Sequence, residues 1–259
     1  MLRNLKKITI SLGSILGLGM LFWIILLMNP SLSYAHQTKL GKVDVYHEQA
    51  LPAGSEALIA QAYEILKTSE IFSKEAQIQL CLNDGSNFPH RFPLRGGVAY
   101  SYWNKAIIYK SNPDFIRNRA FYEWEENQGA KRSWDLVELL AHEFTHTLQS
   151  YHNRLSPLED AIWKIEGYAE YISRSQRKEL RDLKENLRRL RDAQKQASTA
   201  IPWINFQDGS GVPQSYFRYR LLIQYLLEEK GLSYLEILDM NLSDNEVEEE
   251  IISYLNLQN

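Results

Sequence analysis

Apolar and polar positions follow two different periods along the chain, and the change between them divides it into two parts. The first part opens with a strand, a helix and a second strand, predicted at residues 42–47, 54–72 and 76–82. A turn-rich stretch at 83–97 follows. Two short apolar segments, 98–100 and 106–109, then predict a hairpin around Trp103-Asn104-Lys105. We expect these to be the last strands.

From Pro113 onward the apolar spacing is helical almost to the end of the chain. Helices are predicted at residues 113–126, 133–152, 157–196, 213–229 and 243–255. Strands followed by helices indicate an α+β fold, with a small mixed sheet first and a mainly helical half after it. No repeat interrupts residues 36–259, which we expect to form one domain.

The amino-terminal segment reads as a targeting segment. Arg3, Lys6 and Lys7 precede an uncharged stretch at residues 8–28, which as a helix could span about 30 Å of hydrocarbon. Cations before such a stretch favour a cytoplasmic amino terminus and an extracytoplasmic domain. Ser33-Tyr34-Ala35 also fits a signal-peptidase site, so residues 1–35 are either a membrane anchor or a signal peptide cleaved to release a secreted protein.

Charge and cysteine content limit the chemistry. With 29 basic and 32 acidic residues, the net charge of −3 excludes nucleic-acid binding through bulk positive charge. Cys81 is the single cysteine, so a metal would have to be held by histidines and carboxylates. Residues 174–196 form a charged helical extension with an apolar seam of leucines at 180, 183, 187 and 190. The seam is expected to pack on the domain, with a protein partner as the alternative.

The strongest motif is His142-Glu143-Phe144-Thr145-His146 inside an amphipathic helix. Residues four apart share one helix face, so both imidazoles can bind one zinc ion. Glu143 lies about 100° around the helix, where it is placed to accept a proton from a water rather than to bind the metal.

A catalytic zinc needs a third protein ligand. Glu166 becomes that ligand if a turn at Ser156-Pro157 folds the next helix back, and Glu170, one turn later, could then hold a ligand histidine by its second nitrogen. His152 is the alternative, at the spacing of metzincins. It fits poorly because Gln149 stands where that motif needs a glycine to end the helix.

H-E-x-x-H followed by I-E-G-Y-A-E-Y over residues 165–171 resembles the gluzincin branch of zinc metallopeptidases, specifically the small MA-like domains related to thermolysin and the M1 peptidases. The likeness covers about residues 95–235. It implies a zincin-like fold with one Zn²⁺ held by His142, His146 and Glu166, and with Glu170 as the outer acid. It also implies that Glu143 is the general base and that Tyr216, or else Tyr219, stabilises the oxyanion. An edge strand that includes Val98, Ala99 and Tyr100 would pair with the substrate backbone, while Arg218 and Arg220 could contact a carbonyl or carboxylate.

One departure from the M1 pattern bears on the activity. Residues 95–100 carry no acid where M1 aminopeptidases have the glutamate that holds the substrate amine, which favours cleavage inside a peptide or protein. Two other interpretations stay open: a catalytically silent zincin fold that acts as a binding module, and a zinc amidohydrolase acting on non-peptide envelope material.

Overall fold

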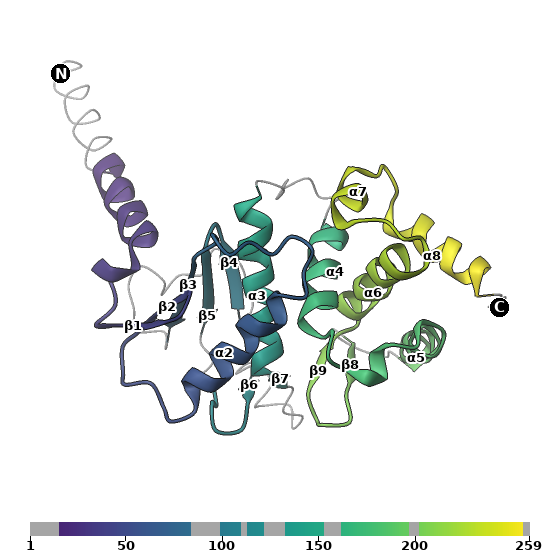
Figure 1. Ribbon diagram of the computed structural model, residues 1–259, viewed down its shortest axis with the longest axis horizontal. Helices are drawn as coiled ribbons and strands as arrows, with labels where there is room; N and C mark the ends of the chain where they lie inside the picture. The colour runs from purple at the N-terminus through teal and green to yellow at the C-terminus, as the bar shows by residue number, and fades with distance from the viewer. Residues whose placement is uncertain are drawn as a thin grey trace, which may run out of the picture.

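A five-stranded mixed sheet forms the amino-terminal half (Figure 1). The computed structural model describes residues 16–83, 99–109, 113–121, 133–152, 162–196 and 202–255. The strands lie in the order β1-β2-β3-β5-β4, with bounds β1 His36–Leu40, β2 Val43–His47, β3 Ile78–Asn83, β4 Ala99–Tyr102 and β5 Lys105–Tyr109. β2, β3 and β5 run parallel, while β1 and β4 are antiparallel strands at the two edges.

Two helices cover one face of this sheet. α2 (Ser55–Leu66) connects β2 to β3, and α3 (Leu136–Tyr151) packs against α2, β4 and β5. Strand residues alternate between the two faces, so Val45, Leu80 and Ala106 join the main core under these helices. Cys81 and Ile107 point to the opposite, outer face, where they are fully buried.

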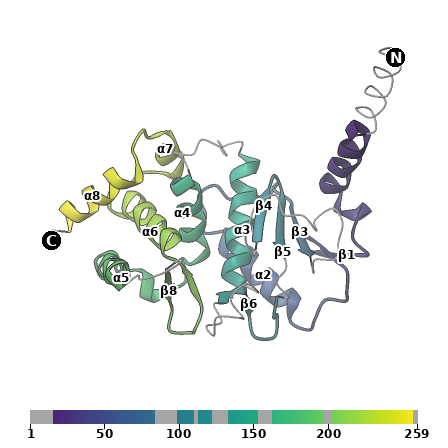
Figure 2. The same cartoon turned by 180° about the vertical axis from the view of Figure 1, so that it is seen from behind.

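The second half is helical and lies on the far side of α3 from the sheet (Figure 2). Its elements are α4 (Ile162–Ser173), the 3₁₀ turn η4 (Lys178–Leu180), α5 (Leu183–Gln196), α6 (Gln214–Gln224), the π-helical turn η5 (Tyr225–Glu229), α7 (Tyr234–Asp239) and α8 (Asp244–Tyr254). α4 packs between α3 and α6. The predicted α+β class, with a small mixed sheet before a mainly helical half, is confirmed.

The expectation that strands end with the hairpin was wrong. Two further pairs follow, β6 (Arg119–Phe121) with β7 (Ser133–Asp135) and β8 (Trp203–Asn205) with β9 (Gly211–Pro213). The predicted helix at 113–126 is also absent from its described part, residues 113–121, which form turns and β6. Asn118 there adopts a left-handed φ of 55° and accepts hydrogen bonds from the first two amides of α3, at Leu136 and Val137. This distant cap could not be read from local periodicity.

The predicted helix at 157–196 is divided into α4, η4 and α5 in its described part. The division lets Arg174 and Arg177 turn inward to Glu138, at the start of α3. The leucine seam at 180, 183, 187 and 190 is buried and α5 packs on α6, which favours packing on the domain. The expected turn at Ser156-Pro157 lies outside the described residues.

The amino-terminal segment is described from Leu16. Residues 16–28 are helical and project from the sheet end of the molecule (Figure 1). No helix within the described ranges is both long enough and apolar enough to cross a membrane. In the segment that follows, Tyr34 packs on the outer face of the sheet with Tyr46, Cys81 and Ile107.

Candidate metal centre

The two histidines of the motif lie side by side on α3. Asp135 caps the helix by accepting a hydrogen bond from the Glu138 amide at 3.0 Å. His142 and His146 are one turn apart, and their Nε2 atoms approach to 3.0 Å. Both side chains are buried, so two polar rings converge on a single point inside the protein.

Glu166, on α4, completes this group. Its Oε2 lies 3.2 Å from Nε2 of His142 and 3.4 Å from Nε2 of His146. One ligand atom from each of the three residues lies within 4.8 Å of the others, so the group could hold a metal ion. Two imidazoles and one carboxylate, with their donor atoms converging, suit zinc.

The charges of the group depend on one another. Burial lowers the pKa of His142, but Glu166 and Glu170 outweigh burial and raise that pKa to about 10. Burial in turn raises the pKa of Glu166, but the two histidines outweigh this and bring it well below its usual range. Without a metal, the ion pairs between these side chains therefore keep the group together.

The outer nitrogen of each imidazole has its own partner. Nδ1 of His142 lies 3.0 Å from Oε1 of Glu170, one turn after Glu166 on α4. Nδ1 of His146 lies 2.7 Å from Oε1 of Gln149. Both rings thus present Nε2 to the shared point, since the other nitrogen is occupied.

Glu170 is the first member of a chain of buried charges. It pairs with Arg174, whose Nε lies 3.3 Å from Oε2 of Glu138, and Glu138 also pairs with Arg177. Arg177 reaches Asp208, at the β8–β9 turn, at 3.1 Å. No local pattern in the sequence marks this chain of charges, because its members come from three separate parts of the sequence.

Gln149 belongs to a neutral network instead. Its Nε2 donates to the Ile165 carbonyl at 3.0 Å and to the Tyr234 hydroxyl at 2.7 Å. The Tyr234 ring stacks on Tyr168 with a centroid distance of 3.6 Å. In the sequence, Gln149 stood out only as a departure from the metzincin motif. Its position three residues after His146, on the same helix face, is the signal that would have identified it.

Glu143 lies beside the group and does not belong to it. The side chain is buried, and burial raises the pKa of its carboxyl group. The Ser101 hydroxyl, on β4, donates a hydrogen bond to this carboxylate. Oε2 of Glu143 has no hydrogen-bond partner among the described residues, which leaves it available to a water or substrate proton.

The other predicted site residues divide into those near the group and those away from it. The Tyr216 ring, on α6, lies 6.0 Å from the His142 ring, and burial together with Glu166 raises the pKa of its hydroxyl. Arg218 instead pairs with Asp244 and Glu248 of α8, and Arg220 is buried against Gln224 and the Leu180 carbonyl. His152 ends α3, where its Nε2 bonds the Ile71 carbonyl at 2.9 Å, away from the metal group.

Gly167, directly after Glu166, sets how closely α4 and α6 pack. A Cβ at this position would lie 2.6 Å from the Tyr219 carbonyl oxygen and 2.8 Å from Cγ1 of Ile223. The absence of a side chain therefore lets α6 bring Tyr216 toward the histidines.

The predicted substrate strand is β4, at the edge of the sheet next to α3. Ala99 faces the main core, while Tyr100 and Tyr102 join the cluster on the outer face. The Tyr100 side chain therefore points away from α3 and the metal group, so β4 could meet a substrate only through its backbone. Val98 lies outside the described residues.

A comparison with known families decides the class of protein. The family model of the collagenase peptidases, Peptidase M9, matches residues 109–243, just over half of the chain. The chain belongs to this family of zinc metallopeptidases. The match includes α3, α4 and α6 and therefore the whole metal group, but it does not reach β4. It supports a zinc metallopeptidase, not specifically the predicted relationship to thermolysin and the M1 peptidases. No curated protein matches the chain.

Proposed function

We propose that this member of the M9 family is an extracytoplasmic zinc endopeptidase, anchored by its amino-terminal segment, in which His142, His146 and Glu166 hold the metal and Glu143 is the general base. The convergence of three ligand atoms, from two buried histidines and the half-buried Glu166, beside the buried Glu143 carboxylate carries the proposal. When bound, zinc supplies Lewis-acid polarisation of the scissile carbonyl and makes the attacking water more acidic.

The protein side chains perform the remaining steps. Glu143 accepts the proton of the attacking water and delivers it to the leaving amine, for which its raised pKa is suited. Ser101 holds the Glu143 carboxylate in place. The Tyr216 hydroxyl remains protonated at neutral pH, so it can donate a hydrogen bond to the carbonyl oxygen as negative charge develops there. The open edge of β4 pairs with the substrate backbone.

Metal content and hydrolysis, measured on the same samples, test this assignment. Wild-type protein should contain one zinc per chain by elemental analysis and digest casein. Glu143→Gln should keep the zinc and lose about 10²–10⁴-fold of the hydrolysis rate. Glu166→Ala should lose the zinc, whereas His152→Ala, the matched control, should keep both zinc and activity.

The alternatives give different results in this experiment. Full activity in Glu143→Gln would exclude the general-base role. Zinc without hydrolysis of casein, gelatin or collagen would favour the binding module or the amidohydrolase. Protease treatment of spheroplasts tests the location: an extracytoplasmic domain is degraded, and a protected one contradicts the proposed topology.

A further inference from the structure

The apolar helix at residues 16–28 carries large side chains that face solvent all round. Five of them are more than half exposed: Leu16, Leu18, Met20, Leu21 and Phe22. A helix that is apolar on every side is suited to a lipid environment. It forms part of the uncharged 21-residue stretch that follows Arg3, Lys6 and Lys7, and this stretch is long enough to lie across a bilayer.

The end of this helix is attached to the substrate strand. The Tyr102 hydroxyl, on β4, donates a hydrogen bond to the Leu27 carbonyl at 2.9 Å. Leu27, Pro30 and Tyr34 are all buried. Ser101, the preceding residue of β4, points the other way and donates to Glu143. The strand therefore lies between the apolar helix on one face and the general base on the other.

The attachment also bears on the predicted cleavage after Ala35. Tyr34 packs on Tyr46, with ring centroids 6.1 Å apart, and helps to cover the fully buried Cys81 and Ile107. β1 begins at His36, so cleavage at Ala35 would remove the segment that covers the outer face of the sheet. Burial of this segment favours its retention in the mature protein.

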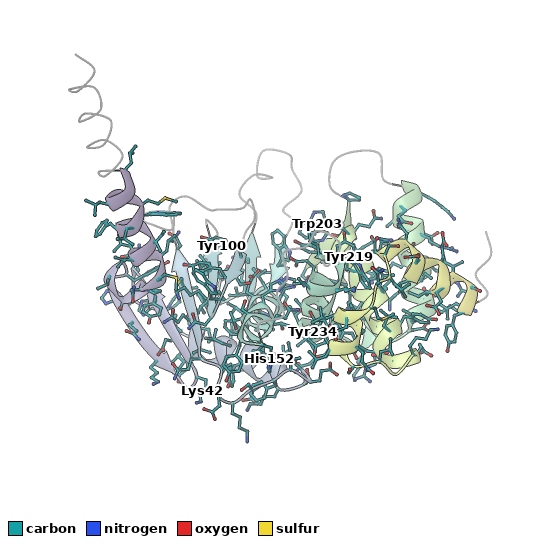
Figure 3. All side chains as sticks on the ribbon, turned by 90° about the horizontal axis from the view of Figure 1, so that it is seen from above. Lys42, Tyr100, His152, Trp203, Tyr219 and Tyr234 are labelled. Carbon is teal, nitrogen blue, oxygen red and sulfur yellow. The ribbon has the colours of Figure 1, made fainter. Side chains whose placement is uncertain are left out.

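The direction of the helix agrees with a site near the bilayer. In Figure 3 the helix leaves the molecule on the side where Tyr100, Trp203 and Tyr219 lie, whereas Lys42 and His152 lie on the opposite side. Tyr100 is on β4, and Tyr219 is one turn from Tyr216 on α6. β4 and α6, which both border the metal group, thus reach the side from which the helix emerges.

Resting on the proposed function, we infer that the amino-terminal helix stays attached in the mature protein and that its docking on β4 keeps the active site next to the bilayer, so that the enzyme cleaves membrane-proximal segments of polypeptides. A freely tethered domain would reach substrates over a wide range of heights above the membrane. The contact between Leu27 and Tyr102 restricts that range.

Two membrane-spanning reporters test this inference. Both carry the same casein-derived stretch, placed either next to the membrane or beyond a proline-rich spacer of about 15 residues, roughly 45 Å long. Each is reconstituted with the full chain in vesicles of phosphatidylcholine and phosphatidylglycerol. The near site should be cut at least about tenfold faster, because sharing a bilayer raises the effective concentration only within reach of the active site.

A variant with a flexible Gly/Ser linker between Asn29 and Pro30 is the decisive comparison. A linker of about 60 residues has a reach of roughly 45 Å and should bring the ratio of the two rates close to one. The same linker appended after Asn259 is the matched control and should keep the preference. Equal cutting of both reporters by the wild type would overturn the inference. So would an unchanged preference for the near site in the variant with the linker after Asn29.

Hydrolysis of soluble casein in detergent separates this inference from the proposed function. The wild type and the two linker variants should digest it at the same rate. Failure of all three proteins would reject the peptidase assignment instead. Mass measurement of the membrane-derived protein adds an independent result. A mature chain that begins at His36 would overturn the retention of the helix.

Discussion

The surroundings of the two candidate ligand histidines differ in kind, although both lie on one face of α3. His142 is held by a carboxylate, Glu170, within a chain of buried charges that extends to Asp208. His146 is held by the neutral amide of Gln149, within a network that ends in stacked tyrosines. A carboxylate partner increases the basicity of its imidazole, whereas an amide mainly orients it.

The two networks should therefore differ in how strongly they respond to the loss of one member. A buried chain of charges is stable only while each charge has its partner, because desolvation is costly for an unpaired one. A neutral network loses less when one member is removed. Substitutions among the residues around His142 should therefore have larger effects than substitutions among the residues around His146.

Arg174→Met should have the largest effect, because it leaves Glu138 and Glu170 buried without their shared cation. Loss of such a partner costs about 3–5 kcal/mol of unfolding free energy. Chemical denaturation of the metal-free protein measures this cost. Arg188→Met, which removes the exposed Arg188–Glu185 pair, is the control and should cost about 0–1 kcal/mol. An equal loss of unfolding free energy in the two variants would show that the chain of buried charges is not a coupled unit.

Tyr216→Phe tests whether a residue beside His142 also takes part in catalysis. Removal of one oxyanion donor lowers kcat by about 10²–10³-fold. Zinc content should not change, because Tyr216 lies beside the His142 ring without belonging to the metal group. The comparison variant is Tyr219→Phe, which should keep kcat. A result with the two tyrosines exchanged would assign the oxyanion role to Tyr219.

Glu170→Gln should weaken zinc binding by about 10–100-fold, as loss of an outer carboxylate does at other zinc sites. Competition with a chromogenic chelator measures the dissociation constant. Glu185→Gln, which changes an exposed acid of α5 outside the chain of buried charges, should leave zinc binding unchanged. An unaltered affinity in Glu170→Gln would mean that Glu170 does not support His142.

The same variant should change the pH dependence of zinc binding. In the metal-free protein the pKa of His142 is raised to about 10, so the imidazole is protonated at neutral pH. The ion pairs of this cation stabilise the fold fully below about pH 6.5 and are lost as pH rises through 10. Zinc must displace the proton, so its affinity should increase by about tenfold per pH unit near neutrality. A shallower slope is expected for Glu170→Gln.

Gln149→Leu should have the smallest effect, about tenfold or less in zinc affinity, because only a neutral partner of His146 is lost. Titration beside Glu170→Gln provides the ranking. A larger loss in Gln149→Leu than in Glu170→Gln would reverse the comparison between the two histidines.

The local sequence determined the parts of the site that depend on helix geometry. His142 and His146 share a face because four residues make about one turn, and Glu166 and Glu170 share a face for the same reason. The order of strands and helices was likewise enough to predict the α+β class. These features depend on periods of a few residues, which a single sequence displays directly.

Only the tertiary structure decided the features that join distant segments. Asn118 caps α3 from a segment whose pattern resembled a helix, Gly167 admits α6, and Arg174 turns inward to balance Glu138 and Glu170. Local periodicity does not show which buried polar groups will pair with one another. Each of them needs a hydrogen-bond or ion-pair partner, and that partner can come from a distant part of the sequence. The sequence could therefore predict the candidate ligands, while the packing of α3, α4 and α6 determined how these side chains are held.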